Sequence, residues 1–160
     1  MSQEELQAVK DYLKENLAKG FIVASSAPFA SPVLFVRKPN GGLRFCVDYR
    51  KLNAITRKDR YPLPLLNETL AQLTDAKIFT KLDIRYAFNR IRMATDQDEE
   101  LITFRTRFGS YKYRVLPFRL TNGPATFQYY INKVLFKYLN VFSTTYMDNI
   151  LIYSSDPLEH

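Results

Sequence analysis

The first twenty residues place apolar side chains at the spacing of an amphipathic helix. These side chains are three or four residues apart and share one helical face, at Leu6, Val9, Leu13 and Leu17. Ser2 and Glu5 match the capping box that begins many helices, and Gly20 is suited to end this one. The pattern predicts an N-terminal helix that buries one face.

Two later regions each show a pair of apolar runs around a short turn, which is the pattern of β-hairpins. In the first, VLFVRK and LRFCVDY enclose the turn PNGG at residues 39–42. In the second, LITFRTRFGSYKYRVLPF turns at Phe108-Gly109-Ser110. Both turns contain glycine, which tolerates the backbone angles of tight turns. The stretch FIVASSAPFASP before the first hairpin is rich in serine and proline, so we predict an irregular connector there.

The middle of the chain alternates a loop, a short helix and a strand. We predict a loop over residues 53–64, because this segment carries charges and two prolines, and a short leucine-rich helix over residues 65–73. KIFTKLDI is a predicted strand that ends near Asp83, and RYAFNRIRM turns away from it.

The last forty residues add one helix and one strand pair. Asn122 is placed to cap a helix that begins around Pro124 and runs toward Tyr138. The stretch TTYMDNILIYSS then joins two apolar, β-prone runs at residues 147–149. Helices and hairpins mixed without βαβ alternation predict an α+β fold with an antiparallel sheet.

Composition narrows the class of protein. The chain has 160 residues, 46% of them hydrophobic, which suits one domain with a core and excludes a disordered chain. No apolar run approaches the roughly 20 residues that span a bilayer, and no signal peptide opens the sequence, so we expect no membrane partner. The single cysteine, Cys46, excludes a disulfide framework and a multi-cysteine zinc site, and is predicted to be a small buried side chain. These features predict an intracellular protein, of the cytoplasm or nucleus.

The net charge of +7 is concentrated in two basic blocks. Residues 37–60 hold eight Lys and Arg against two Asp, and residues 101–140 hold seven with no carboxylate. If the blocks meet in space, they form the kind of surface that binds a polyanion. An ordinary solvated face is the alternative interpretation.

Two aspartates lie where apolar runs end, Asp83 after one run and Asp148 between two others. If the strands are neighbours, the two carboxylates converge at one end of a sheet. Oxygen ligands select hard cations, chiefly Mg²⁺, and paired ions can activate a hydroxyl and stabilise a leaving oxygen in phosphoryl transfer. The alternative is that each aspartate is only a turn or cap residue, which is the commoner role at such positions.

Five motifs, collinear over almost the whole chain, resemble one known family. They are ASPVLFVRKPNGGLRFCVDYRKLNAIT, DRYPLPLLNETL, IFTKLDIRYAFNRIRM, FRTRFGSYKYRVLPFRLTNGPATFQ and YMDNILIYS. The chain resembles the reverse transcriptases of gypsy-type long-terminal-repeat retrotransposons, particularly fungal-like ones. The resemblance implies one domain that comprises the fingers and palm of a right-handed polymerase, with an antiparallel palm sheet and no thumb. About residues 1–80 and 101–122 are expected to lie mainly in the fingers, and the rest mainly in the palm.

The resemblance also implies an activity and its partners. The expected reaction is RNA-directed synthesis of DNA, a Mg²⁺-dependent nucleotidyl transfer from deoxynucleoside triphosphates (dNTPs), and an active relative is expected to bind two Mg²⁺ ions. The expected partners are an RNA or DNA template-primer and a dNTP. Asp83 and Asp148 match the metal-binding catalytic aspartates of the family. Asn149 stands where the family has the second aspartate of its turn, so it is a degenerate catalytic position.

Four further residues match nucleotide-binding positions of the family. Lys38 and Arg44 resemble the cations that hold the triphosphate; the planar fork of Arg suits two phosphate oxygens, whereas Lys acts as a point charge. Phe88 resembles the aromatic gate that stacks against the sugar, and its alternative is an ordinary core aromatic. Gln128 and the start of its helix resemble the segment under the templating base.

The sequence departs from the family at several positions. Asn149 removes a charge from the expected metal site, which predicts a severe loss of activity. Arg119 occupies a glycine position and is expected to crowd the nucleotide pocket, because glycine there indicates a special backbone conformation or a close approach. Asn67 and Thr145 replace the usual Asp and Ala. We interpret these changes as mutational decay of a silenced transposon; the alternative, for Asn149 alone, is a deliberate inactivating substitution.

The departures from the family leave a second function open, and the length of the family's proteins suggests self-association. The alternative to an impaired polymerase is a catalytically silent relic that binds nucleic acid or protein. The family continues past this chain into a thumb, a connection and an RNase H domain, so apolar surface that those parts would cover is expected to drive self-association.

Overall fold

Contacts between residues divide the chain into two units in the computed structural model, which describes residues 1–39 and 41–160. Each unit is built from two segments of the chain: residues 1–57 with 88–121, and residues 58–87 with 122–160. The expected division into fingers and palm stays a prediction. It differs from the division by contacts over residues 58–80, which belong to the second unit, and over residues 88–100, which belong to the first.

The predicted N-terminal helix is present as α1 (Gln3–Ala18). Its capping box is formed, because the Ser2 hydroxyl accepts a hydrogen bond from the Glu5 amide at 3.2 Å and the Glu5 carboxylate accepts one from the Ser2 amide at 2.7 Å. Gly20 follows the helix with φ +68°, a left-handed conformation that glycine adopts readily. The buried stripe is shorter than predicted, since Leu17 is 42% exposed.

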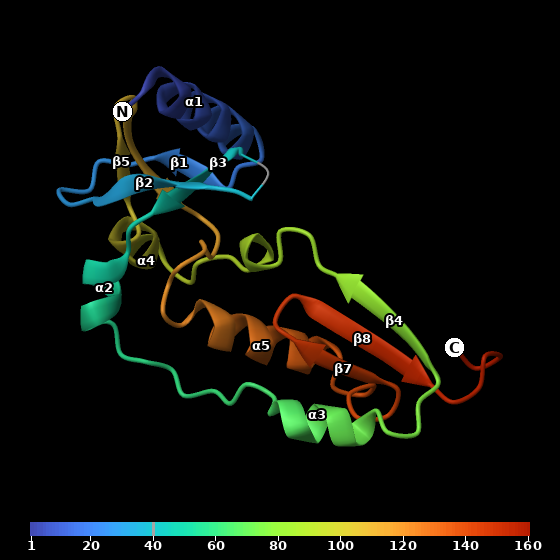
Figure 1. The fold of residues 1–160 in the computed structure, drawn as a ribbon. Coiled ribbons are helices and arrows are strands. Elements are labelled where there is room, and N and C mark those ends of the chain that lie inside the picture. The colour runs from blue at the N-terminus through green and yellow to red at the C-terminus, as the bar shows by residue number, and fades with distance from the viewer. Residues whose placement is uncertain (40) are drawn as a thin grey trace. The chain divides into compact units, whose positions relative to one another are not determined.

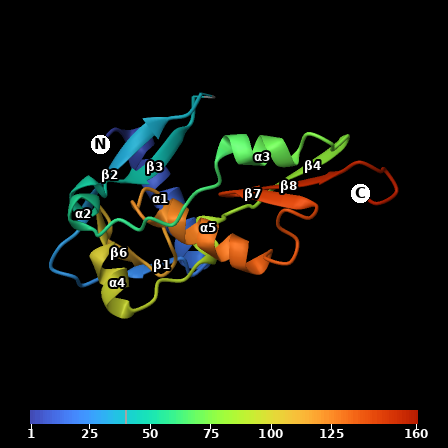
Figure 2. The same ribbon diagram turned by 90° about the horizontal axis from the view of Figure 1, so that it is seen from below.

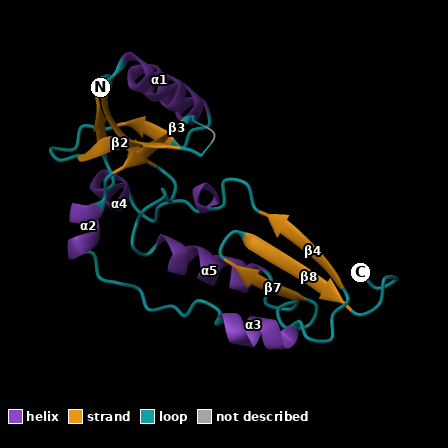
Figure 3. Cartoon of the chain, in the orientation of Figure 1, coloured by secondary structure: helices purple, strands orange, loops and turns teal. Residues whose placement is uncertain are grey.

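The first unit contains, in its described residues, a five-stranded sheet in the order β1-β6-β5-β2-β3. Its strands are β1 (Ile22–Ala24), β2 (Ser31–Arg37), β3 (Leu43–Val47), β5 (Phe104–Thr106) and β6 (Gly109–Tyr113). Neighbouring strands are antiparallel except β2 and β5, which run parallel. Helix α1 lies across this sheet (Figures 1 and 3).

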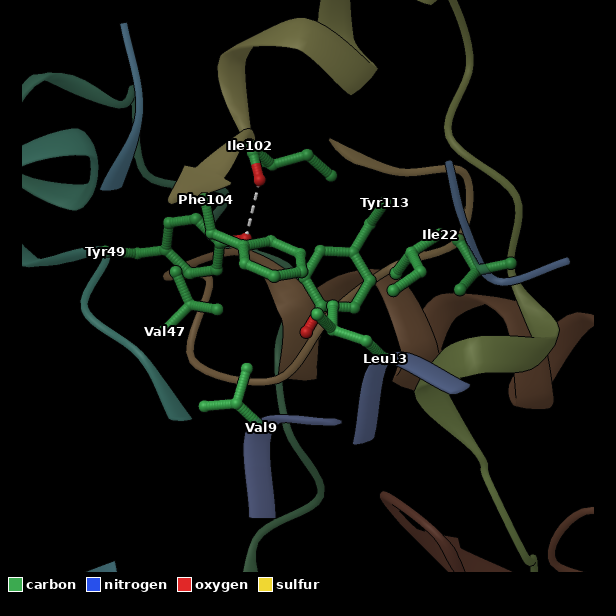
Figure 4. Close-up of a cluster of buried hydrophobic side chains, with 9 residues drawn as sticks. Val9, Leu13, Ile22, Val47, Tyr49, Ile102, Phe104 and Tyr113 are labelled. Atoms are coloured by element: carbon green, nitrogen blue, oxygen red, sulfur yellow. Dashed lines mark hydrogen bonds between the residues drawn. The ribbon is translucent and has the colours of Figure 1, made fainter. Parts of the chain in front are cut away.

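The core of the first unit lies between α1 and the sheet (Figure 4). It consists of buried apolar and aromatic side chains, which include Val9, Leu13, Ile22, Val47, Tyr49, Ile102, Phe104 and Tyr113. The buried hydroxyl of Tyr49 donates a hydrogen bond to the carbonyl oxygen of Ile102 at 2.8 Å, so this polar atom is satisfied inside the core. Burial raises the pKa of Tyr49 well above its ordinary value. Cys46 is 7% exposed, which confirms the prediction of a small buried side chain.

The two predicted hairpins of this unit are present, one of them with a different turn. Strands β2 and β3 pair as predicted, and the ladder continues to the hydrogen bond from the Lys38 amide to the Gly42 carbonyl at 2.7 Å. Asn40, in the predicted PNGG turn, lies outside the described residues. In the second hairpin Thr106 pairs with Gly109, so the turn lies at residues 107–108, earlier than predicted.

Three elements of this unit were not predicted from the sequence. Strand β1 lies in the predicted irregular connector and forms by pairing with β6. Helix α2 (Arg50–Ile55) overlaps the start of the predicted loop. Helix α4 (Asp96–Leu101) is capped by the Thr95 hydroxyl, which accepts from the Asp98 amide at 3.1 Å, a local signal that was present in the sequence.

The second unit contains, where it is described, a three-stranded antiparallel sheet in the order β4-β8-β7. These strands lie side by side in both ribbon views (Figures 1 and 2). The elements of the unit are α3 (Leu66–Gln72), β4 (Ile78–Asp83), α5 (Gly123–Val134), β7 (Ser143–Tyr146) and β8 (Asn149–Ser154). The predicted α+β fold with an antiparallel sheet is therefore confirmed.

Helix α5 begins where predicted, with Pro124 in its first turn, but its cap and its end differ from the prediction. Asn122 occupies the N-cap position, but its side chain does not cap the helix; its Oδ1 accepts a hydrogen bond from the Asp59 amide at 2.9 Å. The helix ends at Val134 rather than near Tyr138. Within the described part of the chain, no helix has the length and apolar character needed to cross a membrane.

Candidate functional site

The end of β4 lies beside the turn between β7 and β8. Asp83 is the register partner of Asn149, and the Ile84 amide donates a hydrogen bond to the Asp148 carbonyl oxygen at 2.9 Å. Directly opposed residues of antiparallel strands have Cβ atoms about 4.5–5.5 Å apart and share one face of the sheet. Strand β4, which ends at Asp83, is thus the neighbour of β8, which begins directly after Asp148; this is the condition that the sequence left open.

A two-residue turn presents Asp148. Tyr146 pairs with Asn149, so Met147 and Asp148 form the loop between the strands. Met147 has φ +49°, which matches the positive φ that tight hairpin turns require at their first central residue. A non-glycine residue held in this region costs energy, so the surrounding contacts must fix it.

Asn149 contacts the aspartate that precedes it. Its Nδ2 donates a hydrogen bond to Oδ1 of Asp148 at 3.3 Å. An aspartate at this position would accept rather than donate. The Asn149 amide therefore carries no charge and occupies one acceptor position on the Asp148 carboxylate.

The side chains of Asp83 and Asp148 offer oxygen atoms, the kind of donor that hard divalent cations prefer. Asp83 is exposed and Asp148 is half-buried, so both carboxylates are accessible to an ion. Mg²⁺ usually takes one or two protein carboxylates together with substrate phosphates. Over residues 1–39 and 41–160, no group of three or more His, Cys, Asp or Glu is arranged to hold a metal. The ligation of Mg²⁺ by Asp83 and Asp148 stays a prediction.

Gln128 lies under the turn, on α5. Its side chain is 0% exposed, and its Oε1 accepts a hydrogen bond from the Met147 amide at 2.8 Å. Its Nε2 donates to Oγ1 of Thr145 at 3.0 Å and to Oδ1 of Asn132 at 2.8 Å. The expected contact of Gln128 with nucleotide stays a prediction, and the structure gives this side chain a role within the protein.

Lys38 and Arg44 share one face of the β2–β3 hairpin. Arg44 is opposite Val36, and the Lys38 amide bonds to Gly42, so the alternation of side chains puts both cations on the same side. Both are exposed. Their geometry suits a shared anionic ligand, and their contact with a triphosphate stays a prediction.

Phe88 lies in a 3₁₀ helix (Phe88–Arg90) and contacts the loop that contains Arg119. Its ring centroid is 5.0 Å from that of Phe118, which is 60% exposed.

Arg119 has φ +72°, so the backbone conformation expected at this glycine position is present although the residue is arginine. Asn53 holds the loop by donating to the Arg119 carbonyl at 2.8 Å and accepting from the Thr121 amide at 2.9 Å. No signal in the sequence indicated this role of Asn53.

Carboxylates neutralise part of the two basic blocks. Glu99, which is buried, lies 3.3 Å from Nζ of Lys112 and 4.0 Å from Nε of Arg114. Hydrogen bonds from Arg50 lower the pKa of Asp48 to about 2. Fewer cations than the sequence suggested are thus free to bind a polyanion.

A family model and curated relatives both match nearly the whole chain or most of it. A family model described as "Reverse transcriptase (RNA-dependent DNA polymerase)" matches residues 36–160. The Tf2-7 and Tf2-3 transposon polyproteins of Schizosaccharomyces pombe are 41% and 40% identical over 156 residues, which are 98% of this chain and 12% of each polyprotein. The chain therefore spans about an eighth of the length of these relatives.

Solved structures show the same fold. A foamy viral protease-reverse transcriptase in complex with RNA/DNA hybrid matches with a TM-score of 0.89 and 19% identity, over 100% of this chain and 21% of that one. A related foamy viral structure in complex with double-stranded DNA matches with a TM-score of 0.88 and 19% identity, over 99% and 28%. At this level of identity the likeness establishes the fold.

Proposed function

The chain belongs to the reverse transcriptase (RNA-dependent DNA polymerase) family, and on this basis we propose that it is a fingers–palm part of a gypsy-type, fungal-like retrotransposon polymerase with impaired catalysis. The observation that carries the proposal is the register of β4 and β8, which sets Asp83 opposite Asn149 and beside Asp148. The proposed partners are an RNA or DNA template-primer and a dNTP, and the proposed compartment is the cytoplasm or nucleus.

The proposed site residues have separate roles in the reaction. Asp83 and Asp148 would hold Mg²⁺, which supplies charge stabilisation to the reacting phosphate when it is bound. Lys38 and Arg44 bind phosphate oxygens, and Phe88 limits the space beside the sugar. Catalysis by this set depends on positioning the primer hydroxyl and the α-phosphate rather than on a covalent intermediate.

Asn149 is the reason to expect impaired catalysis. Removing one unit charge about 4 Å from a divalent ion weakens their interaction by several kcal/mol at an effective dielectric near 20. Each loss of about 1.36 kcal/mol in transition-state stabilisation is tenfold in rate. The hydrogen bond from Asn149 to Asp148 further competes with a cation for that carboxylate.

A second candidate function is a catalytically silent relic that binds nucleic acid or protein. The exposed cations of the β2–β3 hairpin favour it, because binding to a phosphate backbone requires charge but no metal site. This binding would lack sequence preference and weaken steeply with salt.

Primer extension separates the two functions. The chain and its Asn149→Asp variant are compared for dNTP incorporation in Mg²⁺, with Asp83→Ala added to the variant to test the site. We expect Asn149→Asp to raise incorporation by at least about a hundredfold, consistent with a gain of several kcal/mol, and Asp83→Ala to abolish it. Asn140→Asp is the matched control, since it adds the same charge outside the turn. Salt-sensitive binding without incorporation in any variant would favour the silent relic.

We also propose self-association through apolar side chains of the second unit. Large apolar residues are exposed there, among them Phe79, Leu82, Val134, Phe136, Val141 and Phe142. Burial of such surface against a second copy would be favourable. Sedimentation velocity over a concentration series measures it, and a monomer at the highest concentration would contradict it.

A further inference from the structure

We propose that Asn132 and Thr145 are positioning residues, which act through Gln128 to fix the turn that presents Asp148. This inference rests on the proposed function for the importance of Asp148, and its structural part can be tested without metal. The residues involved form the turn-anchoring network, defined as Tyr61, Gln128, Asn132, Thr145 and the amide of Met147.

The direction of each hydrogen bond in this network follows from the one before it. The Met147 amide can only donate, so the atom of Gln128 that it meets at 2.8 Å must be the oxygen. The Gln128 nitrogen must then donate, and it does so to Oδ1 of Asn132 at 2.8 Å. The Asn132 nitrogen in turn donates to the Tyr61 hydroxyl at 3.0 Å. A single set of orientations satisfies all these atoms, so the network specifies one arrangement.

Thr145 closes this network. Its hydroxyl accepts from Nε2 of Gln128 at 3.0 Å and donates to Oδ1 of Asn132 at 2.9 Å. The Thr145 side chain is nearly fully buried, with the residue 3% exposed. An alanine at this position, which is common in the family, has no hydroxyl to make either bond. The hydroxyl of Thr145 thus takes part in the hydrogen bonds that hold the turn.

Burial gives the network its effect on the turn. Gln128 is fully buried, so a bond lost from its amide is not replaced by water. The backbone group of the turn that it holds is the amide of Met147, the residue with positive φ immediately before Asp148. Loosening the network should release that conformation and let the carboxylate move away from Asp83.

The test compares three threonine variants of the full chain. Thr145→Val removes the hydroxyl at nearly constant volume, Thr145→Ser keeps it, and Thr144→Val is the matched control on the adjacent residue, which is buried on the other face of β7. Hydrogen exchange of the Met147 amide by NMR is the first readout. We expect exchange at least tenfold faster in Thr145→Val, with Thr145→Ser and Thr144→Val close to the unchanged chain. Amides at the far end of β8, such as Tyr153, should keep their exchange rates in all variants.

Mn²⁺ titration supplies the second readout. Broadening of the amide signals of residues 83–85 and 147–149 measures the affinity of the aspartate pair, with Asp148→Ala as the negative control. We expect the dissociation constant of Thr145→Val to rise at least fivefold and that of Thr144→Val to stay unchanged. If Thr145→Val does not fold, Tyr61→Phe removes only the end of the network, and we expect a smaller increase, about threefold, in the exchange rate of Met147.

The two readouts separate failure of the inference from failure of the proposed function. Equal exchange of Met147 in Thr145→Val and Thr144→Val overturns the inference, even if Mn²⁺ binds. Absence of any Asp148-dependent broadening in the unchanged chain overturns the metal site, whereas the exchange result still decides the inference.

Discussion

Each unit of the chain has a loop with a non-glycine residue in the left-handed region, and each loop is held by a side-chain amide. In the first unit Arg119 has φ +72°, and Asn53 bonds to the backbone on both sides of it. In the second unit Met147 has φ +49°, and Gln128 bonds to its amide. The two anchors differ in burial, because Asn53 is half-buried whereas Gln128 is fully buried.

This difference determines how firmly each loop is fixed. Water can replace hydrogen bonds of a half-buried amide, so the loop around Arg119 should tolerate changes in its anchor. Buried hydrogen bonds have no such substitute, and an unmatched partner costs its full desolvation. The turn that presents Asp148 is therefore the more rigidly specified of the two.

Among substitutions at these two loops, the largest loss of stability is expected for Gln128→Met. This change keeps much of the volume but leaves the buried Met147 amide without its acceptor. It also removes the donor to Thr145 Oγ1 and Asn132 Oδ1, so we expect a loss of about 2–3 kcal/mol in the free energy of unfolding. Urea denaturation measures it. Gln72→Met, which alters an exposed amide of the same unit, is the control and should change stability by less than about 0.5 kcal/mol.

A smaller effect is expected for Asn53→Ala. The loss of two hydrogen bonds from a half-buried site should cost about 1 kcal/mol, because water compensates in part. The same denaturation experiment applies. A cost equal to or above that of Gln128→Met would contradict the contrast between the two anchors.

Arg119→Gly should stabilise the protein slightly. The left-handed conformation costs a non-glycine residue about 1–2 kcal/mol, and the greater entropy of an unfolded glycine offsets roughly half of this. We expect a net gain of about 0.5–1 kcal/mol by the balance of these terms. Arg119→Ala is the matched control, since it removes the long side chain but keeps the strained Cβ, and it should give no such gain.

The smallest effect concerns pH and Asp48, whose carboxylate bonds to Arg50 near the loop of Arg119. The pKa of Asp48 is lowered to about 2 in the folded protein, from an ordinary value of 3.8, with the Arg50 hydrogen bond as the main cause and Arg119 as a minor one. The unfolded chain therefore binds this proton more tightly, so the contribution to stability is present above about pH 4 and is lost as pH falls toward 2. Urea midpoints of the unchanged chain and Asp48→Asn between pH 5 and 2 should converge at the acid end. Parallel curves would contradict the assignment.

Several features of this protein were predictable from sequence because neighbouring residues produce them. The capping box of Ser2 and Glu5, the β2–β3 hairpin and the strand pair around Met147 and Asp148 each depend on contacts within a few residues. The special backbone at Arg119 was also predictable, because the family motif has glycine there. The five collinear motifs likewise predicted the family to which the chain belongs.

Tertiary structure decided which distant segments pair. Strand β1 exists because it pairs with β6, about ninety residues away, and no local pattern in its serine- and proline-rich stretch required that. Asp83 reaches the turn of Asp148 only through the register of β4 on β8, in which a shift of one residue would send its side chain to the other face. Gln128 meets the same turn only because α5 packs beside β7. Local sequence thus determined the helices and hairpins whose contacts lie within a few residues, whereas the pairing of strands determined whether β1 forms at all. Strand pairing and the directions of buried hydrogen bonds also determined what these elements hold in place.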